Sequence, residues 1–230
     1  MFIVHLKNKT AGLLHGTVTV GHVLKHGGFG LGTLNLLDGE VVVLDGTAYQ
    51  QRADGTCRAV PDDAMTPFMM VTDHDEAATE IRHIENLGWA SLQESLASML
   101  PSENLFASIK IEGEFEYMKL RAVRKQCCDR PLVEVTREQA VFEFRNTHGS
   151  LIGFYTPPFL GDALSVPGFH LHFISKDLGK GGHVLDIQLK DATVSIQPLY
   201  STIQGFPKTV DFANAKLTGD VKSELEEAEN

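Results

Sequence analysis

Three histidines in the last third of the chain have a spacing that suits a metal ion. His170 and His172 alternate with apolar residues in the run 168–175, so a strand would place both imidazoles on one face. A glycine-rich turn over residues 177–182 follows, and His183 then opens another strand-like run that would bring a third imidazole back to the pair. Three imidazole nitrogens with an open coordination position are typical of catalytic zinc, whereas structural zinc sites are closed and rich in thiolates.

The same pattern has an ordinary alternative, because alternation by itself places polar residues in pairs on the solvent-exposed face of a sheet. Under that alternative His170 and His172 would be exposed and His183 would be a turn residue. The glycine-rich return to His183 favours the metal site. The other histidines are predicted to be surface or local hydrogen-bonding residues: His5, His15, His22, His26, His74, His83 and His148.

The elements that would position these histidines are mostly strands. Short runs rich in Val, Ile, Phe and Tyr are separated by turn signals such as Asp45 with Gly46, and Glu112 with Gly113, which predicts a largely antiparallel or mixed sheet. The spacing of Ser91 and Glu94 matches a capping box and predicts the clearest helix, while residues 19–27 predict a shorter one. The strand-like runs are 41–44, 105–111, 115–123, 141–144, 152–156, 169–174, 184–189 and 193–196.

The composition limits the possible classes of function. The chain has 230 residues, 43% of them hydrophobic, which is enough for a sizeable core. Its 20 basic and 30 acidic residues give a formal net charge of −10, which would repel nucleic acid and anionic membrane surfaces. Three cysteines, two of them adjacent at Cys127 and Cys128, form neither an even disulfide framework nor a CxxC metal motif. With neither a leader segment nor a run long enough to span a membrane, we expect a cytoplasmic protein.

The histidine segment, residues 167–174 with residues 181–186, resembles the zinc-binding segment of the acetolactate decarboxylases. The resemblance implies that His170, His172 and His183 hold zinc. Further motifs that match the family follow one another in the same order and cover nearly the whole chain: 26–35, 37–40, 49–50, 66–68, 101–106, 120–123, 153–157 and 211–215.

The resemblance also implies the remaining residues of the site. The glutamate of the Leu-Asp-Gly-Glu motif matches Glu40, the arginine after the second central strand matches Arg121, and a threonine of the pocket matches Thr33. A glutamate close to the C-terminus of the family matches Glu229 best. We therefore expect Glu40, Arg121 and Glu229 to be catalytic, with Thr33 and Arg121 in contact with the substrate.

The implied reaction is the decarboxylation of 2-acetolactate, a small 2-hydroxy-3-keto acid, to acetoin and carbon dioxide, a step of acetoin biosynthesis and the butanediol pathway. Zinc that chelates the C3 keto and C2 hydroxyl oxygens would stabilise the enolate that forms as carbon dioxide leaves. The planar fork of Arg121 suits a carboxylate or the developing enolate. Glu40 and Glu229 would orient the hydroxyl group and manage its proton, or would provide a carboxylate contact to the metal.

We expect an α+β fold that is strand-rich, with two mixed or antiparallel, half-barrel-like sheet subdomains and few helices. A polar segment at residues 124–132 predicts the boundary between them. Residues 1–130 would form an N-terminal subdomain that contributes Glu40 and Arg121, and residues 131–230 a C-terminal one with the histidines and the acidic tail. We further expect a homodimer that has no nucleic-acid or membrane partner.

Two other functions share the histidine pattern. Cupin-like metal dioxygenases or isomerases also place two histidines on one strand and a third later, but they carry a glutamate a few residues after the pair, and residues 173–176 supply none. A non-catalytic metal-binding or assembly module of the same fold would have lost Glu40 or Arg121, and both are present. Release of carbon dioxide and formation of acetoin from acetolactate would distinguish the three.

Overall fold

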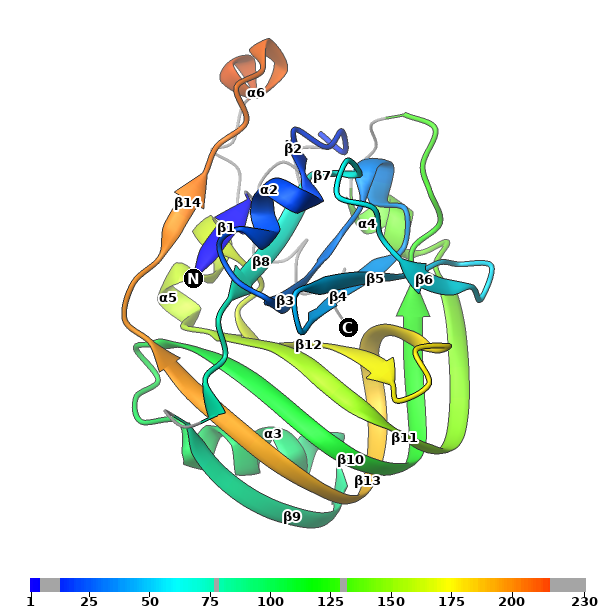
Figure 1. The fold of residues 1–230 in the computed structure, drawn as a ribbon, viewed down its shortest axis with the longest axis vertical. Coiled ribbons are helices and arrows are strands. Elements are labelled where there is room, and N and C mark those ends of the chain that lie inside the picture. The colour runs from blue at the N-terminus through cyan, green and yellow to red at the C-terminus, as the bar shows by residue number, and fades with distance from the viewer. Residues whose placement is uncertain (5–12, 77–78, 129–131, 216–230) are drawn as a thin grey trace.

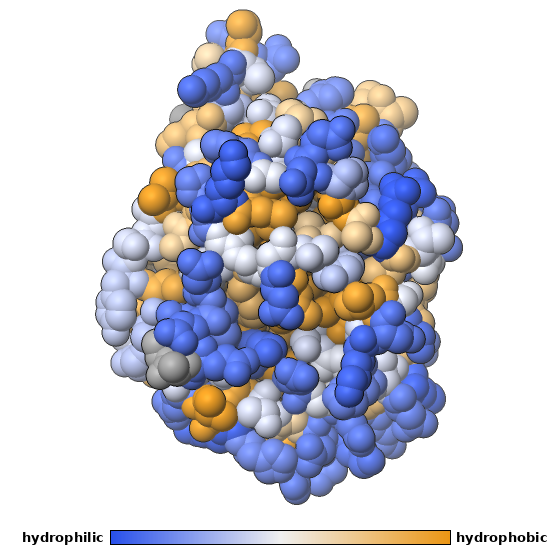
Figure 2. Space-filling model, in the orientation of Figure 1, coloured by the Kyte–Doolittle hydropathy of each residue, from blue (hydrophilic) through white to orange (hydrophobic). Residues whose placement is uncertain are grey.

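A computed structural model describes residues 1–4, 13–76, 79–128 and 132–215 (Figure 1). Strands in two large sheets dominate this part of the chain, and the helices are short apart from one of three turns. The predicted strand-rich α+β class is confirmed. Polar side chains cover most of the face in Figure 2, in particular its lower end, where the second sheet curves.

The first sheet has seven strands in the order β14-β1-β8-β3-β4-β5-β6. Neighbouring strands are antiparallel except β1 and β14. The turn predicted at Asp45 and Gly46 joins β4 to β5, with both residues at positive φ, as a tight hairpin requires. The strands are β1 (Phe2–Val4), β3 (Phe29–Thr33), β4 (Glu40–Leu44), β5 (Thr47–Gln51), β6 (Cys57–Ala59), β8 (Phe68–Thr72) and β14 (Ile203–Gly205).

The second sheet has five long, curved strands in the order β10-β11-β12-β13-β9, and β13 also pairs with β10. Strands β10 to β13 therefore close on one another, which bends this sheet strongly (Figure 1). The strands are β9 (Glu80–Gly88), β10 (Phe106–Ala122), β11 (Ala140–Thr156), β12 (Gly168–Ser175) and β13 (Gly181–Leu199).

The turn predicted at Glu112 and Gly113 is wrong, because both residues lie inside the continuous strand β10. Gly113 instead permits a close approach between strands, since a Cβ there would lie 2.1 Å from the carbonyl oxygen of Asp191. The pairing with β13 then shifts register at Glu114 and Phe115. Gly113 thus allows a long strand to bend and does not reverse the chain.

Helix α3 (Trp89–Met99) buries Leu92, Leu96 and Met99 as predicted, but it does not begin at the capping box of Ser91. Strand β9 pairs with β13 as far as Gly88, so the chain leaves the sheet there and enters the helix at once. The remaining short elements are β2 (Val18–Thr19), α2 (Val20–Leu24), a 3-10 turn (Asn35–Leu37), β7 (Met65–Thr66), α4 (Leu132–Thr136), α5 (Pro158–Leu164) and α6 (Val210–Asn214).

Both faces of β12 are buried over most of its length. Leu171 and Phe173 of β12 pack into a core that α3 closes from one side, whereas Ile174 packs against Phe29 and Val42 of the seven-stranded sheet. The predicted alternation along β12 is therefore confirmed, but the face that carries the histidines lies between the two sheets and not in solvent.

The chain passes from the first sheet to the second between β8 and β9, and it returns to the first with β14. Strands β10 and β11, on either side of the predicted boundary at residue 130, pair along almost their whole length. Arg121 on β10 therefore lies in the sheet of the histidines and not in that of Glu40, contrary to its expected place. The division into subdomains of residues 1–130 and 131–230 otherwise stays a prediction.

Among the described residues, no helix combines the length and the apolar character needed to cross a membrane.

Candidate functional site

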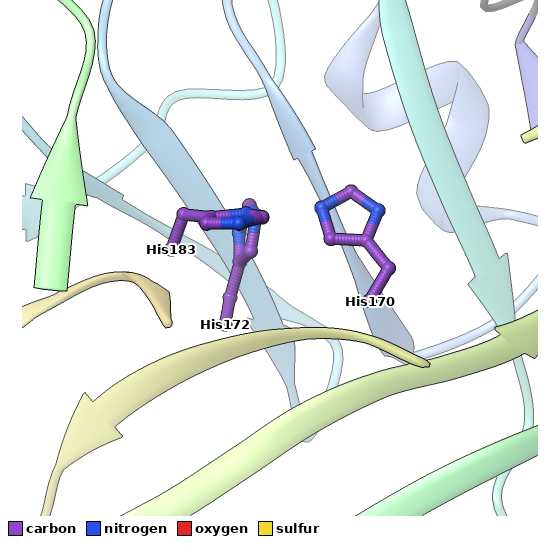
Figure 3. Close-up of side chains that lie close together, drawn as sticks. All are labelled: His170, His172 and His183. Atoms are coloured by element: carbon purple, nitrogen blue, oxygen red, sulfur yellow. The ribbon is translucent and has the colours of Figure 1, made fainter. Parts of the chain in front are cut away.

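Figure 3 shows His170, His172 and His183 with their rings turned toward one another. Their ring centroids lie 5.0 to 5.3 Å apart, and one ring nitrogen of each lies within 4.8 Å of the others. None of the three side chains is more than 4% exposed. The alternative of a solvated sheet face is therefore wrong, and the cluster can hold a metal ion.

The register of the second sheet brings these residues together with Arg121. His172 of β12 faces His183 of β13, and His183 faces Arg121 of β10, so the three form one row across neighbouring strands. Gly182 has a φ of 139°, and a Cβ there would lie 2.7 Å from the carbonyl oxygen of Arg121. Only a glycine fits this backbone conformation beside the row without strain.

The orientation of His172 is set by the first sheet. Its Nδ1 lies 2.8 Å from the carbonyl oxygen of Val41 on β4, and because a carbonyl only accepts, Nδ1 carries the proton. The Nε2 atom is then the basic nitrogen, and it lies 3.5 Å from Oε2 of Glu40. A hydrogen bond from the second nitrogen to a backbone carbonyl is typical of metal-binding histidines.

Glu40 and Thr33 reach the site from the seven-stranded sheet. They are direct partners at the ends of β4 and β3, and both are buried. The Thr33 hydroxyl donates to the carbonyl oxygen of Gly39 at 2.6 Å, which ties β3 to the loop that precedes Glu40. Leu36 and Leu37 in this loop have φ values of 60° and 53°, a conformation that bulky side chains rarely adopt.

Two backbone hydrogen bonds hold this loop against the segment that follows β10. The amide of Gly39 donates to the carbonyl oxygen of Val123 at 3.1 Å, and the amide of Gln126 donates to that of Leu36 at 2.8 Å. The loop that ends at Glu40 is thus fastened to the strand that carries Arg121. This connection holds the two sheets together at the edge of the site.

Arg121 is almost completely buried, and its Nη1 donates to Oε1 of Gln139 at 2.9 Å. This bond fixes the plane of the guanidinium group, so Gln139 helps to position Arg121. Sequence reasoning missed Gln139, because it lies 18 residues from Arg121 and nothing in its neighbourhood marks it. Only the pairing of β10 with β11 brings the two together.

A cavity between the two sheets collects the described part of the predicted site. Thr136 on α4 lines it too, and this residue was also missed from sequence. Glu229 lies outside the described residues. The lining consists of Gly32, Thr33, Leu37, Glu40, Phe68, Arg121, Val123, Thr136, His170, His172 and His183.

The donor set of this cavity fits zinc. Three imidazoles converge with a carboxylate beside them, and the described residues that line the cavity include no cysteine. Catalytic zinc takes three protein ligands and keeps a position for water or substrate. The other group of ligand-type side chains within the described ranges, His83, Glu85 and Asp191, is exposed to solvent, as predicted for a surface histidine.

His74 differs from the predicted surface or locally bonding histidine, because it is partly buried and its hydrogen-bond partners are distant in the sequence. Its Nδ1 lies 2.9 Å from the hydroxyl of Ser108, its Nε2 lies 2.8 Å from that of Ser195, and its ring stacks on Phe29. Burial, followed by the charge of Lys110, lowers the pKa of His74 to about 4. The side chain is therefore neutral at pH 7 and links the two sheets away from the cavity.

Comparisons with known proteins show which family this chain is similar to. The family model described as alpha-acetolactate decarboxylase matches residues 5–219. The alpha-acetolactate decarboxylase of Methanosarcina mazei is 38% identical over 95% of this chain and 75% of that protein, and that of Lactococcus lactis is 40% identical over 86% and 83%. The crystal structure of alpha-acetolactate decarboxylase from Bacillus subtilis superposes with a TM-score of 0.94 over 100% of both chains at 33% identity.

Proposed function

The chain belongs to the alpha-acetolactate decarboxylase family, and from this premise we propose that it converts 2-acetolactate to acetoin and carbon dioxide with zinc held by His170, His172 and His183. It is a decarboxylase, and hence a carbon–carbon lyase. One observation carries the proposal: three buried imidazoles, a carboxylate and a guanidinium group line one cavity between the two sheets.

Zinc held by the three histidines would supply a Lewis acid for the C3 keto and C2 hydroxyl oxygens and would stabilise the negative charge that develops as carbon dioxide leaves. The three histidines present neutral nitrogens for this ion. The carbonyl of Val41 orients His172 for metal binding. Nδ1 donates its proton to this carbonyl, so Nε2 is the nitrogen with a lone pair for the ion.

Arg121 binds the substrate carboxylate, the group that is lost as carbon dioxide. A guanidinium group offers two parallel donors to a carboxylate, and Gln139 fixes the plane in which these donors lie. Because Arg121 is buried, its attraction to an anion is screened less than it would be at the surface. The substrate is thereby oriented with its carboxylate toward β10.

Glu40 manages the proton of the C2 hydroxyl group. Its Oε2 lies 3.5 Å from Nε2 of His172, which places the carboxylate at the edge of the metal-binding group. From there Glu40 can accept a hydrogen bond from the hydroxyl or deliver a proton to the carbon that loses carbon dioxide. Glu229 is proposed as the second carboxylate for this role.

Thr33 contacts the substrate from the opposite sheet. Its hydroxyl proton is directed to the carbonyl oxygen of Gly39, so its oxygen can accept one hydrogen bond from a substrate hydroxyl. Phe68, Leu37 and Val123 line the cavity beside these polar groups and give it apolar walls. Such walls strengthen the electrostatic interactions within the site.

The test uses purified full-length protein that has been stripped of metal and reloaded with one equivalent of zinc, manganese or magnesium. With racemic acetolactate, we expect release of carbon dioxide and formation of acetoin in the zinc-loaded protein and little turnover in the stripped one. Turnover that is independent of added metal would refute the zinc proposal. Zinc binding without release of carbon dioxide would instead favour a non-catalytic metal-binding module.

We also propose that the enzyme acts in the cytoplasm as a homodimer without nucleic-acid or membrane partners. The net charge of −10 argues against nucleic-acid and membrane partners. The two adjacent cysteines, which match no disulfide framework, support a reducing compartment. Sedimentation velocity over a range of protein concentrations tests the oligomeric state. A monomer at micromolar concentration would refute the homodimer.

A further inference from the structure

Two adjacent cysteines lie beside the connection between the sheets and take no part in the proposed reaction. The Sγ atoms of Cys127 and Cys128 are 3.5 Å apart, and both side chains are exposed. Neighbouring side chains on an extended chain point to opposite sides, so two thiols in contact require a bent backbone. The pair is therefore already arranged for a reaction in which both sulfur atoms take part.

We propose that Cys127 and Cys128 form a reversible vicinal disulfide that lowers the activity of the enzyme. The oxidant is a low-molecular-weight disulfide, RSSR. One cysteine thiolate attacks RSSR and expels RS⁻, and the second thiolate attacks the resulting mixed disulfide and expels another RS⁻. The two protons of the cysteines end on the two RS⁻ ions, so RSSR is reduced to two RSH while the cysteine pair is oxidised.

The bond is strained and therefore easily reversed. Consecutive Cα atoms are 3.8 Å apart across a trans peptide, whereas disulfides prefer about 4.4 to 6.8 Å. Closing the ring thus requires the peptide between Cys127 and Cys128 to change its conformation. Strained, exposed disulfides have higher reduction potentials and are typical of regulatory rather than structural positions.

The change is transmitted to the site through Gln126. This residue precedes Cys127, is buried, and donates its amide to the carbonyl oxygen of Leu36 at 2.8 Å. Leu36 begins the loop of unusual φ values that ends at Glu40. A new backbone conformation at residues 127 and 128 displaces Gln126 from this bond, and the loop then releases Glu40 from its position beside His172.

The third cysteine serves as an internal control. Cys57 lies on β6, is partly buried, and has no cysteine beside it in the sequence. Burial raises the pKa of its thiol, which lowers the fraction of reactive thiolate. Cys57 is therefore expected to react slowly and without effect on the cavity.

The experiment titrates the zinc-loaded full-length enzyme with glutathione disulfide and then with dithiothreitol. Alkylation without reduction, followed by mass spectrometry of the tryptic peptide with both cysteines, should reveal a species that lacks two hydrogen atoms and carries no glutathione. We expect kcat/KM to fall about tenfold, the scale on which loss of supporting groups affects metal sites, and to recover on reduction. C57S should respond like the natural enzyme, and C127S should form only a mixed disulfide.

The activity readout rests on the proposed decarboxylase function, whereas formation of the ring does not. Hydrogen exchange of the peptides that contain Gly39 and Gln126 gives a second readout, which should show faster exchange after oxidation in the natural enzyme but not in C127S. Stable glutathione adducts on both cysteines would overturn the proposal. It would also be overturned by a vicinal disulfide that leaves both exchange and kcat/KM unchanged.

Discussion

At the scale of single residues, the site depends on how each polar side chain is held by its neighbours. His172 is oriented by a backbone carbonyl of the other sheet, and Arg121 is oriented by Gln139. Neither the carbonyl of Val41 nor the side chain of Gln139 would touch the substrate. Substituting a residue that would touch the metal or the substrate is therefore expected to have a different effect from substituting a residue that only orients it.

His172→Ala should remove most of the zinc and most of the activity together, because a site with three protein ligands loses one of them. Elemental analysis and turnover of the same preparation measure both quantities. His148→Ala is the matched control, because His148 is an exposed histidine on β11 that does not line the cavity. Full zinc occupancy in the His172 variant would contradict the assignment of the ligands.

Arg121→Lys should lower kcat/KM roughly 10- to 100-fold, because hydrogen bonds to charged groups contribute about 1.5 to 3 kcal/mol each and an ammonium group cannot reproduce the planar fork. Gln139→Ala should act in the same direction but less strongly, since it leaves the charge in place. Steady-state kinetics with acetolactate measure both variants. Arg124→Lys, at an exposed arginine nearby, should be close to neutral; equal losses in the Arg124 and Arg121 variants would contradict the role of Arg121.

At the scale of elements, the site depends on the register of three strands. The row of His172, His183 and Arg121 exists because β13 pairs with β12 on one side and with β10 on the other. The chain enters β13 through Gly182, whose backbone conformation places His183 in this row. A change at this glycine should therefore act on the proposed metal site without removing one of its proposed ligands.

Gly182→Ala should destabilise the fold by about 1 to 3 kcal/mol, because a non-glycine residue is strained at this φ. It should also weaken zinc binding, since the Cβ would press on the carbonyl oxygen of Arg121. Denaturant unfolding and zinc titration measure the two effects. Gly179→Ala in the same turn is the control, as its Cβ would meet only an ordinary contact at 3.5 Å. Unchanged stability in the Gly182 variant would show that the backbone there tolerates a side chain.

At the scale of the whole molecule, His74 joins the two sheets, and its protonation should make stability depend on pH. Its pKa is lowered from 6.5 to about 4, mainly by burial, so the unfolded chain binds more protons between these values. The stabilisation is complete above pH 6.5 and is lost as the pH falls toward 4. The nearby charges are those of Lys110, Glu76 and Asp75.

His74→Gln should be less stable than the natural protein at pH 7 but should lose less stability on acidification. The free energy of unfolding between pH 7 and pH 4, from denaturant titrations, measures this difference. His83→Gln, at an exposed histidine, should retain the slope of the natural protein. An identical slope in the His74 variant would show that other groups cause the acid sensitivity.

The acidic tail gives a further prediction for the whole molecule, made from sequence alone. Glu229→Gln, or truncation after Ala228, should lower turnover about 10²-fold if this carboxylate handles a proton in the transition state, while the zinc is largely kept. Glu226→Gln is the matched control within the same tail. Full activity of the truncated protein would mean that the tail is only a solvated end.

The sequence by itself determined the type of the fold and the three histidines that meet in the cavity. Alternation along residues 168–175 is a local property, and so is the glycine-rich return to His183; both are readable without knowledge of distant contacts. The same holds for the hairpin at Asp45 and Gly46. The site residues Glu40, Arg121 and Thr33 followed from the resemblance to a family, since a single buried polar residue leaves no local pattern.

Only the tertiary structure decided which sheet carries Arg121 and which residues support the site. It also decided where a long strand continues through a predicted turn. Glycine is typical of turns, yet Gly113 lies inside a strand. A glycine is needed there because the backbone of Asp191 on the neighbouring strand approaches too closely for a side chain. Gln139 meets Arg121 where β10 pairs with β11, and the carbonyl of Val41 meets His172 where the two sheets pack on each other. Such contacts are fixed by strand register and sheet packing, which sum many weak interactions along the chain, so no short segment encodes them.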